Sequence, residues 1–353
     1  MKIAMLSPIA WRTPPRHYGP WELVVSNLTE ELVKLGHEVT LYATGDSKTA
    51  ARLEYICPYP YEENPEIDPK VWEAMHIAHL FENAHKYDII HNNYDFIPLA
   101  FSRMTDTPVV TTIHGFSSPK IVPIYREYNR DNYYVSISDS DRHRDLDYVR
   151  TVYHGINLDE FTFSDKPGDY LVFLGRIHPD KGTEQAIEIA RQSGMKLLIA
   201  GIIQDKDYYN ERVAPHIDNR QIIYIGSVGP PQRDELLRNA YAVLHPISYQ
   251  EMFGLTVVES MACGTPVVAF NKGSMPEVIK DGVSGFLVQN VAEACEVMPK
   301  VASLPRSHCR QWVETRFSRQ RMALDYQSVY QDILGGNAFP VEKTGTSPEI
   351  MLN

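Results

Sequence analysis

Short apolar runs that end on polar or glycine residues alternate with amphipathic stretches along the chain. The run KIAMLSP (2–8) is followed by a proline-bearing loop and then by a stretch, 23–35, whose apolar residues keep helical spacing. Gly36 ends this predicted helix, and EVTLYAT (38–44) has the pattern of the next strand. The chain is therefore predicted to open with a strand, a loop, a helix and a second strand.

The same strand pattern recurs further along the first half. It appears in YDIIHNN (87–93), PVVTTIHG (108–115) and NYYVSIS (132–138), each closing on polar or glycine residues, with helical segments between them. Apolar runs of this kind are typical of strands that are buried on both faces. They predict a parallel, doubly wound sheet.

After a stretch with weak periodicity (152–169), the pattern restarts and predicts a second α/β domain. Strands are expected in YLVFLGR, KLLIAG, QIIYIGSV, YAVLHPI, PVVAF and SGFLV, and helices from Thr183 to about Ser193 and in QRDELLRNA, LTVVESMACG and MPEVIKDG. We expect domains at 1–160 and 169–305, a helical segment at 306–335 that packs back on the N-terminal domain, and a loose tail at 336–353.

Composition and charge narrow the function classes. The 353 residues, with 43% hydrophobic and 22% charged positions, fit a two-domain globular protein. A net charge of -11 without any Lys/Arg block argues against a nucleic-acid partner and limits membrane association to a peripheral one. The first apolar run is too short for a signal peptide or a membrane span. Four cysteines without paired spacing argue against a metal site or a disulfide, so a cytoplasmic location is expected.

Two cations stand where a phosphate group would be bound. Ligands of doubly wound sheets lie beyond the carboxyl ends of the strands, and here they are expected in a cleft between the two domains. In FLGRIHPDKGTEQ, Arg176 and Lys181 lie between a strand end and a helix that begins near Gly182 and Thr183. Charge-assisted bonds and the helix N-terminus suit a diphosphate. Surface ion pairs are the alternative interpretation.

Two carboxylates follow a later strand end, in YQEMFGLTVVESMACG. The helix is expected to begin near Gly254 and Leu255, which puts Glu251 in the loop before it and Glu259 about one turn inside it. They are therefore not on one helix face, and we interpret them as contacts to different parts of an elongated ligand. The alternatives are a solvated loop residue for Glu251 and a carboxylate favoured by the helix dipole for Glu259.

Other candidates are weaker. His114 ends a predicted strand and suits a hydrogen bond to a sugar hydroxyl or a phosphate, although a lone histidine is more often structural. The first loop offers Gly19 and its neighbours as backbone donors, but it lacks Gly-x-Gly-x-x-Gly, which disfavours a nicotinamide cofactor. Surface positions are favoured for Asp95, Arg103 and Asp139.

Taken together, these segments resemble family 4 of the retaining, nucleotide-sugar-dependent glycosyltransferases (glycosyltransferase group 1) over most of residues 1–330. The specific feature is the E-x7-E array of Glu251 and Glu259, in order with Arg176 and Lys181. The resemblance implies the GT-B fold, an α/β architecture of two doubly wound, Rossmann-like parallel-sheet domains facing across a cleft. The N-terminal domain would bind the acceptor and the C-terminal domain the nucleotide sugar.

The resemblance also implies roles for particular residues. Arg176 and Lys181 would hold the donor diphosphate and Glu259 the ribose hydroxyls. The remaining implied contacts are Glu251 with the backbone of Met252, Phe253, Gly254 and Leu255 to sugar and phosphates, His114 to the transferred sugar, and Gly19 to the diphosphate. Pro20 departs from the Gly-Gly that is frequent in the family, and it removes a backbone donor from that loop.

The implied reaction is retaining transfer of a hexose from a donor such as UDP-glucose or GDP-mannose to a saccharide, lipid-linked or small-molecule acceptor. No cofactor or metal is expected, and front-face substitution is favoured because no second well-placed carboxylate offers itself as a nucleophile. The alternatives are a non-hydrolysing sugar-nucleotide epimerase or a phosphorylase of the same fold, a non-catalytic binder, and a glycosidase. Base, sugar, acceptor and oligomeric state stay open.

Overall fold

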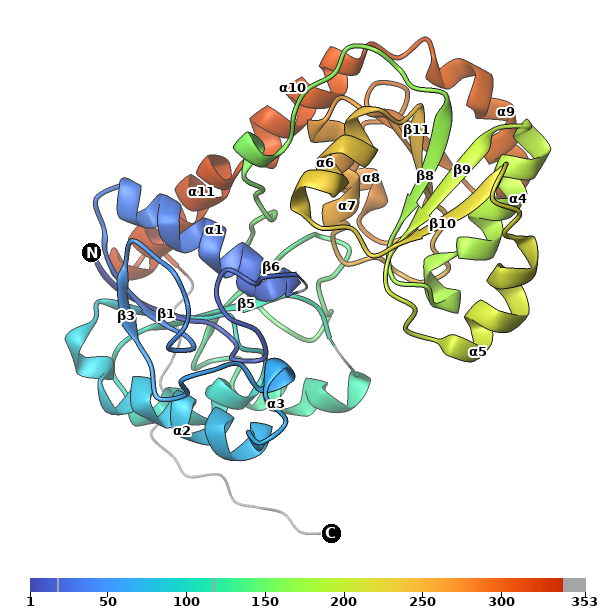
Figure 1. Ribbon diagram of the computed structural model, residues 1–353. Coiled ribbons are helices and arrows are strands. Elements are labelled where there is room, and N and C mark those ends of the chain that lie inside the picture. The colour runs from blue at the N-terminus through green and yellow to red at the C-terminus, as the bar shows by residue number, and fades with distance from the viewer. Residues whose placement is uncertain (18, 117, 339–353) are drawn as a thin grey trace. The chain divides into compact units, whose positions relative to one another are not determined.

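The computed structural model describes residues 1–17, 19–116 and 118–338, and the chain forms two compact units (Figure 1). Of the described residues, unit 1 contains those within 1–136, 142–151 and 324–338, and unit 2 contains 137–141 and 152–323. Residues 339–353 of the expected tail lie outside the described residues. Across the described part, every helix is too short or too polar to span a lipid bilayer.

Unit 1 is built on a sheet of seven parallel strands in the order β3-β2-β1-β4-β5-β6-β7. The strands are β1 (Lys2–Leu6), β2 (Glu38–Tyr42), β3 (Arg52–Glu54), β4 (Ile89–Asn92), β5 (Val109–Ile113), β6 (Tyr133–Ser136) and β7 (Tyr148–Thr151). The five predicted strands are confirmed. The sequence missed β3 and β7, which are the two edge strands and contain no fully buried residue.

The helices of unit 1 pack on this sheet and place its loops. They are α1 (Pro20–Lys34), α2 (Pro69–Glu82), α3 (Val122–Glu127) and the greater part of α11 (Arg319–Leu334), with 3-10 turns that include η1 (Tyr61–Glu63) and η3 (Ile97–Met104). Helix α1 buries Val25 and Leu28, whereas α2 packs on the face that carries Ala4 and Leu6. Because β1 pairs with both β2 and β4, the strand order reverses at β1.

Unit 2 repeats the architecture with six parallel strands in the order β10-β9-β8-β11-β12-β13. They are β8 (Tyr170–Leu174), β9 (Lys196–Ala200), β10 (Ile222–Gly226), β11 (Ala242–His245), β12 (Val267–Phe270) and β13 (Gly285–Val288). The helices are α4 (Thr183–Ser193), α5 (Lys206–Tyr208), α6 (Pro230–Arg238), α7 (Leu255–Ala262), α8 (Met275–Val278), α9 (Val291–Val301) and α10 (Arg306–Arg316). The predicted second α/β domain is confirmed.

Side chains along β8 show why helices cover both faces of this sheet. Leu171 and Phe173 point to one face and pack with residues of α4 and α9. Val172, between them, points to the other face and packs with residues of α6, α7 and α10. Because both faces are buried, the strands are continuous apolar runs in the sequence, and this pattern is what predicted them.

The expected helical segment 306–335 forms two helices. Helix α10 packs against α7 inside unit 2, while α11 contributes two buried tyrosines to unit 1. Tyr330 Oη lies 2.7 Å from His91 Nδ1, His91 Nε2 lies 2.7 Å from Thr112 Oγ1, and Thr112 Oγ1 lies 2.6 Å from Tyr326 Oη. Burial lowers the pKa of His91 to about 3, so this chain of hydrogen bonds contains a neutral ring.

This network predicts a stability effect. Tyr330→Phe removes the partner of a buried His91 nitrogen and should lower the free energy of unfolding by about 1–3 kcal/mol, measured by urea unfolding. Tyr59→Phe, at a side chain that is 56% exposed, is the matched control. Equal midpoints for the two variants would contradict the assigned role of the network.

Candidate functional site

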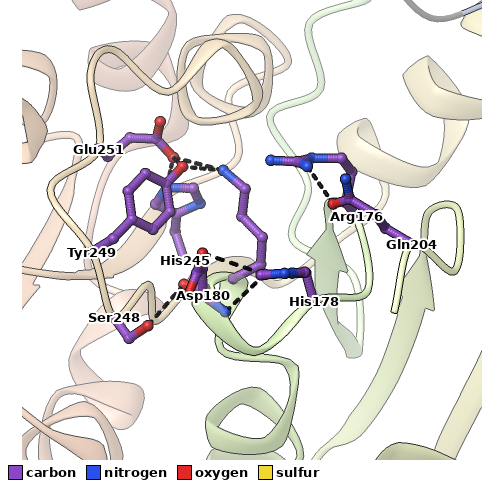
Figure 2. A network of polar contacts seen from close by, with 9 residues as sticks. Arg176, His178, Asp180, Gln204, His245, Ser248, Tyr249 and Glu251 are labelled. Carbon is purple, nitrogen blue, oxygen red and sulfur yellow. Dashed lines mark hydrogen bonds and ion pairs between the residues drawn. The ribbon is translucent and has the colours of Figure 1, made fainter. Parts of the chain in front are cut away.

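The predicted cations and Glu251 come together at the carboxyl edge of the unit 2 sheet (Figure 2). Arg176 and Lys181 lie in the loop after β8, and Glu251 lies in the loop after β11. Strand β8 pairs with both β9 and β11, so the strand order reverses there. Ligands of doubly wound sheets bind at such a point.

A glycine lets these two loops touch. Gly182 has a φ of 75°, and a Cβ atom at this position would lie 1.9 Å from the carbonyl oxygen of Pro246. The loops are also joined by a hydrogen bond, because the Ser248 backbone N–H donates to the Asp180 carbonyl oxygen over 2.9 Å. Any larger residue at 182 would push the loops apart.

The contact between the loops is a compact polar cluster. Lys181 Nζ lies 3.0 Å from Glu251 Oε2 and also donates to the Tyr249 hydroxyl, which in turn donates to Glu251 Oε2 over 2.7 Å. Both charged side chains are largely buried, with 17% of Lys181 and 9% of Glu251 exposed. Glu251 is therefore a paired carboxylate, and the interpretation as a solvated loop residue is wrong.

The electrostatics of the cluster keep Glu251 ionised. Burial opposes the charge, but His245, Lys181 and Tyr249 outweigh it and hold the pKa of Glu251 below its usual range. His245 Nε2 lies 3.3 Å from Glu251 Oε2, without the alignment of a hydrogen bond. A carboxyl group that stays ionised near neutral pH cannot serve as a general acid.

Arg176 stands beside this cluster on the same loop. Its guanidinium donates to Gln204 Oε1, and its charge acts on the Tyr249 hydroxyl. Burial and the Glu251 carboxylate raise the pKa of Tyr249, so the hydroxyl stays protonated beside the carboxylate. The site thus holds two cations, one of which Glu251 already neutralises.

The loop after Glu251 leads into a helix whose first turn has no side-chain cap. Gly254 is the N-cap of α7, with a φ of 86°, and it has no side-chain oxygen to accept from the first N–H groups. Phe253 is 3% exposed and packs against His154 and Phe317, which anchors the loop, and the Met252 carbonyl oxygen accepts from Ser138. The backbone at Gly254 and Leu255 is therefore held with first-turn donors open to an anion.

Glu259 lies on α7 and takes part in a different network. It is 4% exposed, and its Oε1 atom lies 3.0 Å from Arg233 Nη1 of α6. Burial raises the pKa of Glu259, Arg233 works against this rise, and the nearby Glu160 adds to it. The two carboxylates of the E-x7-E array thus have separate partners.

Two predicted residues belong to unit 1. His114 follows β5, is 6% exposed, and places Nε2 3.1 Å from Asn93 Oδ1 while its ring stacks on Trp21. Gly19 is the N-cap of α1.

Of the three weaker candidates, Arg103 pairs with Glu127 and Asp131 at the surface. The Asp95 carboxyl accepts a hydrogen bond from Tyr125, and the Asp139 backbone N–H donates to Glu277.

Sequence reasoning missed three polar residues of the unit 2 networks. They are Tyr249 and His245 beside Glu251, and Arg233 beside Glu259. His245 ends a predicted strand, so the rule that ligands meet strand ends could have marked it. Arg233 lies in a helix after β10, and nothing in the sequence pattern pairs it with α7. Among the described residues, no group of three or more His, Cys, Asp or Glu could hold a metal ion.

Fold and site together define a class: an α/β enzyme of two doubly wound units with paired cations and an uncapped helix N-terminus at the carboxyl edge of one sheet. Family models narrow this class. Residues 22–160 match Glycosyltransferase Family 4, and residues 157–314 match Glycosyl transferases group 1. The chain belongs to the group 1 (family 4) glycosyltransferases and is a transferase.

Individual relatives agree with this assignment. The chain is 26% identical over 336 residues to an uncharacterised glycosyltransferase of Methanocaldococcus jannaschii, covering 82% of this chain and 85% of that one. It is 24% identical over 330 residues to a D-inositol 3-phosphate glycosyltransferase of an Arthrobacter species, covering 76% and 78%. The structure of Anabaena HepE with UDP and glucose matches with a TM-score of 0.68 at 18% identity, covering 94% and 100%. This likeness supports the GT-B fold.

The cluster around Glu251 predicts a titration effect. In Lys181→Met the pKa of Glu251 should rise, because a cation that favours the carboxylate is lost while burial remains. NMR titration of carboxyl-labelled glutamate would measure the shift, with Lys206→Met on exposed α5 as the matched control. A Glu251 titration unchanged by Lys181→Met would contradict the pairing.

The second network predicts a stability effect that depends on pH. Arg233→Met leaves Glu259 buried without its cation and should lower the free energy of unfolding by about 3 kcal/mol at neutral pH. The loss should shrink as the pH falls, because burial already raises the pKa of Glu259 and a protonated carboxyl needs no cation. Urea unfolding at several pH values measures it, with exposed Arg220→Met as control. A loss independent of pH would refute the explanation.

Proposed function

We propose that this glycosyltransferase moves a hexose from a nucleoside-diphosphate sugar to an acceptor hydroxyl with retention of anomeric configuration and without a metal. Arg176 and Lys181 bind the diphosphate, and Glu259 binds the ribose hydroxyls. Glu251 and the backbone of residues 252–255 bind the transferred sugar and the phosphates. UDP-glucose and GDP-mannose are the first donors to test, and the complex of HepE with UDP and glucose favours the uridine nucleotide.

One observation carries this proposal: the two predicted cations and Glu251 meet beside the uncapped N-terminus of α7. A diphosphate needs positive charge and N–H donors, and this edge of the unit 2 sheet offers both. The same groups stabilise the charge that develops on the leaving diphosphate, which is the role that a metal ion plays in other transferases.

Front-face substitution fits the state of Glu251. Double displacement needs a carboxylate nucleophile, but Glu251 Oε2 already accepts from Lys181 and Tyr249. In the proposed step the bond between the anomeric carbon and the phosphate oxygen breaks, and the acceptor oxygen bonds to the same face of the sugar. The acceptor proton passes to the departing phosphate oxygen. Glu251 positions the sugar and does not become covalently attached.

Unit 1 contributes the remaining proposed contacts. His114 binds the transferred sugar, Gly19 approaches the diphosphate with its backbone, and the acceptor binds to unit 1. A reducing, cytoplasmic location is proposed because all four cysteines are free thiols and three of them are buried.

The diphosphate assignment predicts a loss of affinity. Lys181→Ala should weaken binding of the nucleoside diphosphate by about 1.5–3 kcal/mol, through loss of a charge-assisted contact. Calorimetry with UDP and GDP measures it, and Lys206→Ala serves as the matched control. Unchanged affinity for both nucleotides would contradict the assignment of Lys181 to the donor site.

The reaction itself is tested with a panel of nucleotide sugars. The preferred donor is found by hydrolysis and thermal stabilisation, and NMR of the glycosylated product should show the anomeric configuration of the donor. Inverted product, or a covalent glycosyl-enzyme at Glu251 detected by mass spectrometry, would overturn the mechanism. Turnover of the donor to an epimer, or cleavage that requires phosphate, would instead indicate the epimerase or the phosphorylase.

A further inference from the structure

Unit 1 contains a cavity of about 510 Å³ whose walls come from the point where its strand order reverses. The loops after β1 and β4 form two walls, and the first turn of α1, η1 and α2 form the others. This is the counterpart in unit 1 of the place where Arg176, Lys181 and Glu251 meet in unit 2. Doubly wound sheets bind their ligands at this place.

Aromatic rings make up much of the wall. Trp11, Trp21, Tyr61, Tyr94 and Phe96 all line the cavity. Flat, polarisable rings pack well against the C–H faces of a sugar ring, and the hydroxyl groups around such a ring need polar partners at its edge. The cavity has the size and the apolar surface that a mono- or disaccharide needs.

The polar groups of the cavity are acidic. Glu22, Glu73 and Asp95 line it, and the described residues of its wall include no lysine or arginine. Glu22 is 3% exposed and accepts the Trp11 backbone N–H over 3.2 Å, and the Asp95 carboxyl accepts the Tyr125 hydroxyl over 2.6 Å. A phosphate or carboxylate on a ligand would face these carboxyl groups without a cation to balance it.

Burial leaves one of these groups able to donate as well as accept. It raises the pKa of Glu22 to about 7 and that of Asp95 to about 6, and in both cases hydrogen bonds partly offset the rise. Near neutral pH Glu22 can therefore pair with a sugar hydroxyl in either direction, whereas Asp95 is mostly ionised and mainly accepts.

A buried hydroxyl without a well-aligned partner lines the cavity. Tyr94 is 6% exposed, and its hydroxyl makes no well-aligned hydrogen bond within the described part of the chain. Burial raises the pKa of Tyr94, and Glu73, which lies beside this hydroxyl and lines the same cavity, adds to the rise. A ligand hydroxyl between Tyr94 and Glu73 would give both groups an aligned partner.

The cavity also adjoins a residue of the proposed reaction. The ring of Trp21, which lines the cavity, stacks on His114 with centroids 5.2 Å apart and an angle of 22° between the planes. His114 is the unit 1 residue proposed to contact the transferred sugar.

We propose that this cavity is the acceptor site and that it takes an uncharged, polyhydroxylated acceptor, a saccharide, in preference to a phosphorylated one. The inference rests on the proposed function and adds the chemical class of the acceptor. It separates this chain from the relatives named D-inositol 3-phosphate glycosyltransferases, whose name contains a phosphorylated inositol.

The test uses matched pairs of acceptors, each a neutral compound and its phosphate ester, including myo-inositol with D-inositol 3-phosphate and mono- and disaccharides with their phosphates. Release of nucleoside diphosphate from the preferred donor is measured with and without each compound. We expect at least one neutral member to accelerate release, and its kcat/KM to exceed that of its ester by about tenfold or more.

Variants of α2 connect the preference to the cavity. Glu73→Lys should lower the ratio of kcat/KM between the neutral compound and its ester by about tenfold, because it places a cation in the wall. Glu73→Gln should also lower this ratio of kcat/KM, but by a smaller factor. Glu82→Lys, exposed at the end of the same helix, is the matched control for the change in charge and should leave the ratio unchanged.

The outcomes separate this inference from the proposed function. If no nucleotide sugar is bound or hydrolysed, the proposed function fails. If a donor is hydrolysed but phosphate esters are accepted as well as their neutral partners, or no neutral compound accelerates release, the acceptor inference alone is overturned. An equal change of the ratio in Glu82→Lys and Glu73→Lys would show that the preference does not arise in this cavity.

Discussion

The ion pair between Lys181 and Glu251 is the interaction on which the candidate site depends. It joins two loops that are far apart in sequence, and Gly182 lets the loop after β8 lie against Pro246 after β11, where a larger residue would clash. The parallel sheet supplies the starting arrangement, since β8 and β11 are neighbours whose carboxyl ends meet at one edge. The ion pair then fixes the position from which Lys181 can face a ligand. It also neutralises part of the charge that Lys181 presents there.

The two units use the same topological point for different chemistry. In unit 2 the reversal of strand order holds two cations and the uncapped N-terminus of α7, which suits an anion. In unit 1 it holds a cavity with aromatic walls and three carboxyl groups, which suits a neutral polyol. A nucleotide sugar and a saccharide acceptor differ in this way, so the charge of each site matches one of the two proposed substrates and disfavours the other.

The sequence was sufficient for those features that depend on local pattern. Central strands are buried on both faces and read as apolar runs, whereas the edge strands β3 and β7 have no buried run and were missed. Arg176, Lys181, Glu251 and Glu259 could be placed because each lies in a loop after a predicted strand or in the helix that follows that loop. Their partners could not, since Arg233 reaches Glu259 only through the packing of α6 on α7, and Tyr249 and His245 surround Glu251 only once the loop after β11 is folded.

The two glutamates of one motif have pKa shifts in opposite directions, and this difference separates their roles. Both are buried, which alone would favour the neutral acid. Glu251 is surrounded by Lys181, Tyr249 and His245, which together outweigh burial, whereas Glu259 has one cation, Arg233, and burial prevails. A glycosidase needs one carboxylic acid to protonate a leaving group and one carboxylate facing the sugar, both close to the scissile bond. Here the ionised carboxylate is already paired and the other lies in a separate network on α7, which supports the proposal that the motif holds a ligand at two places rather than exchanging protons with it.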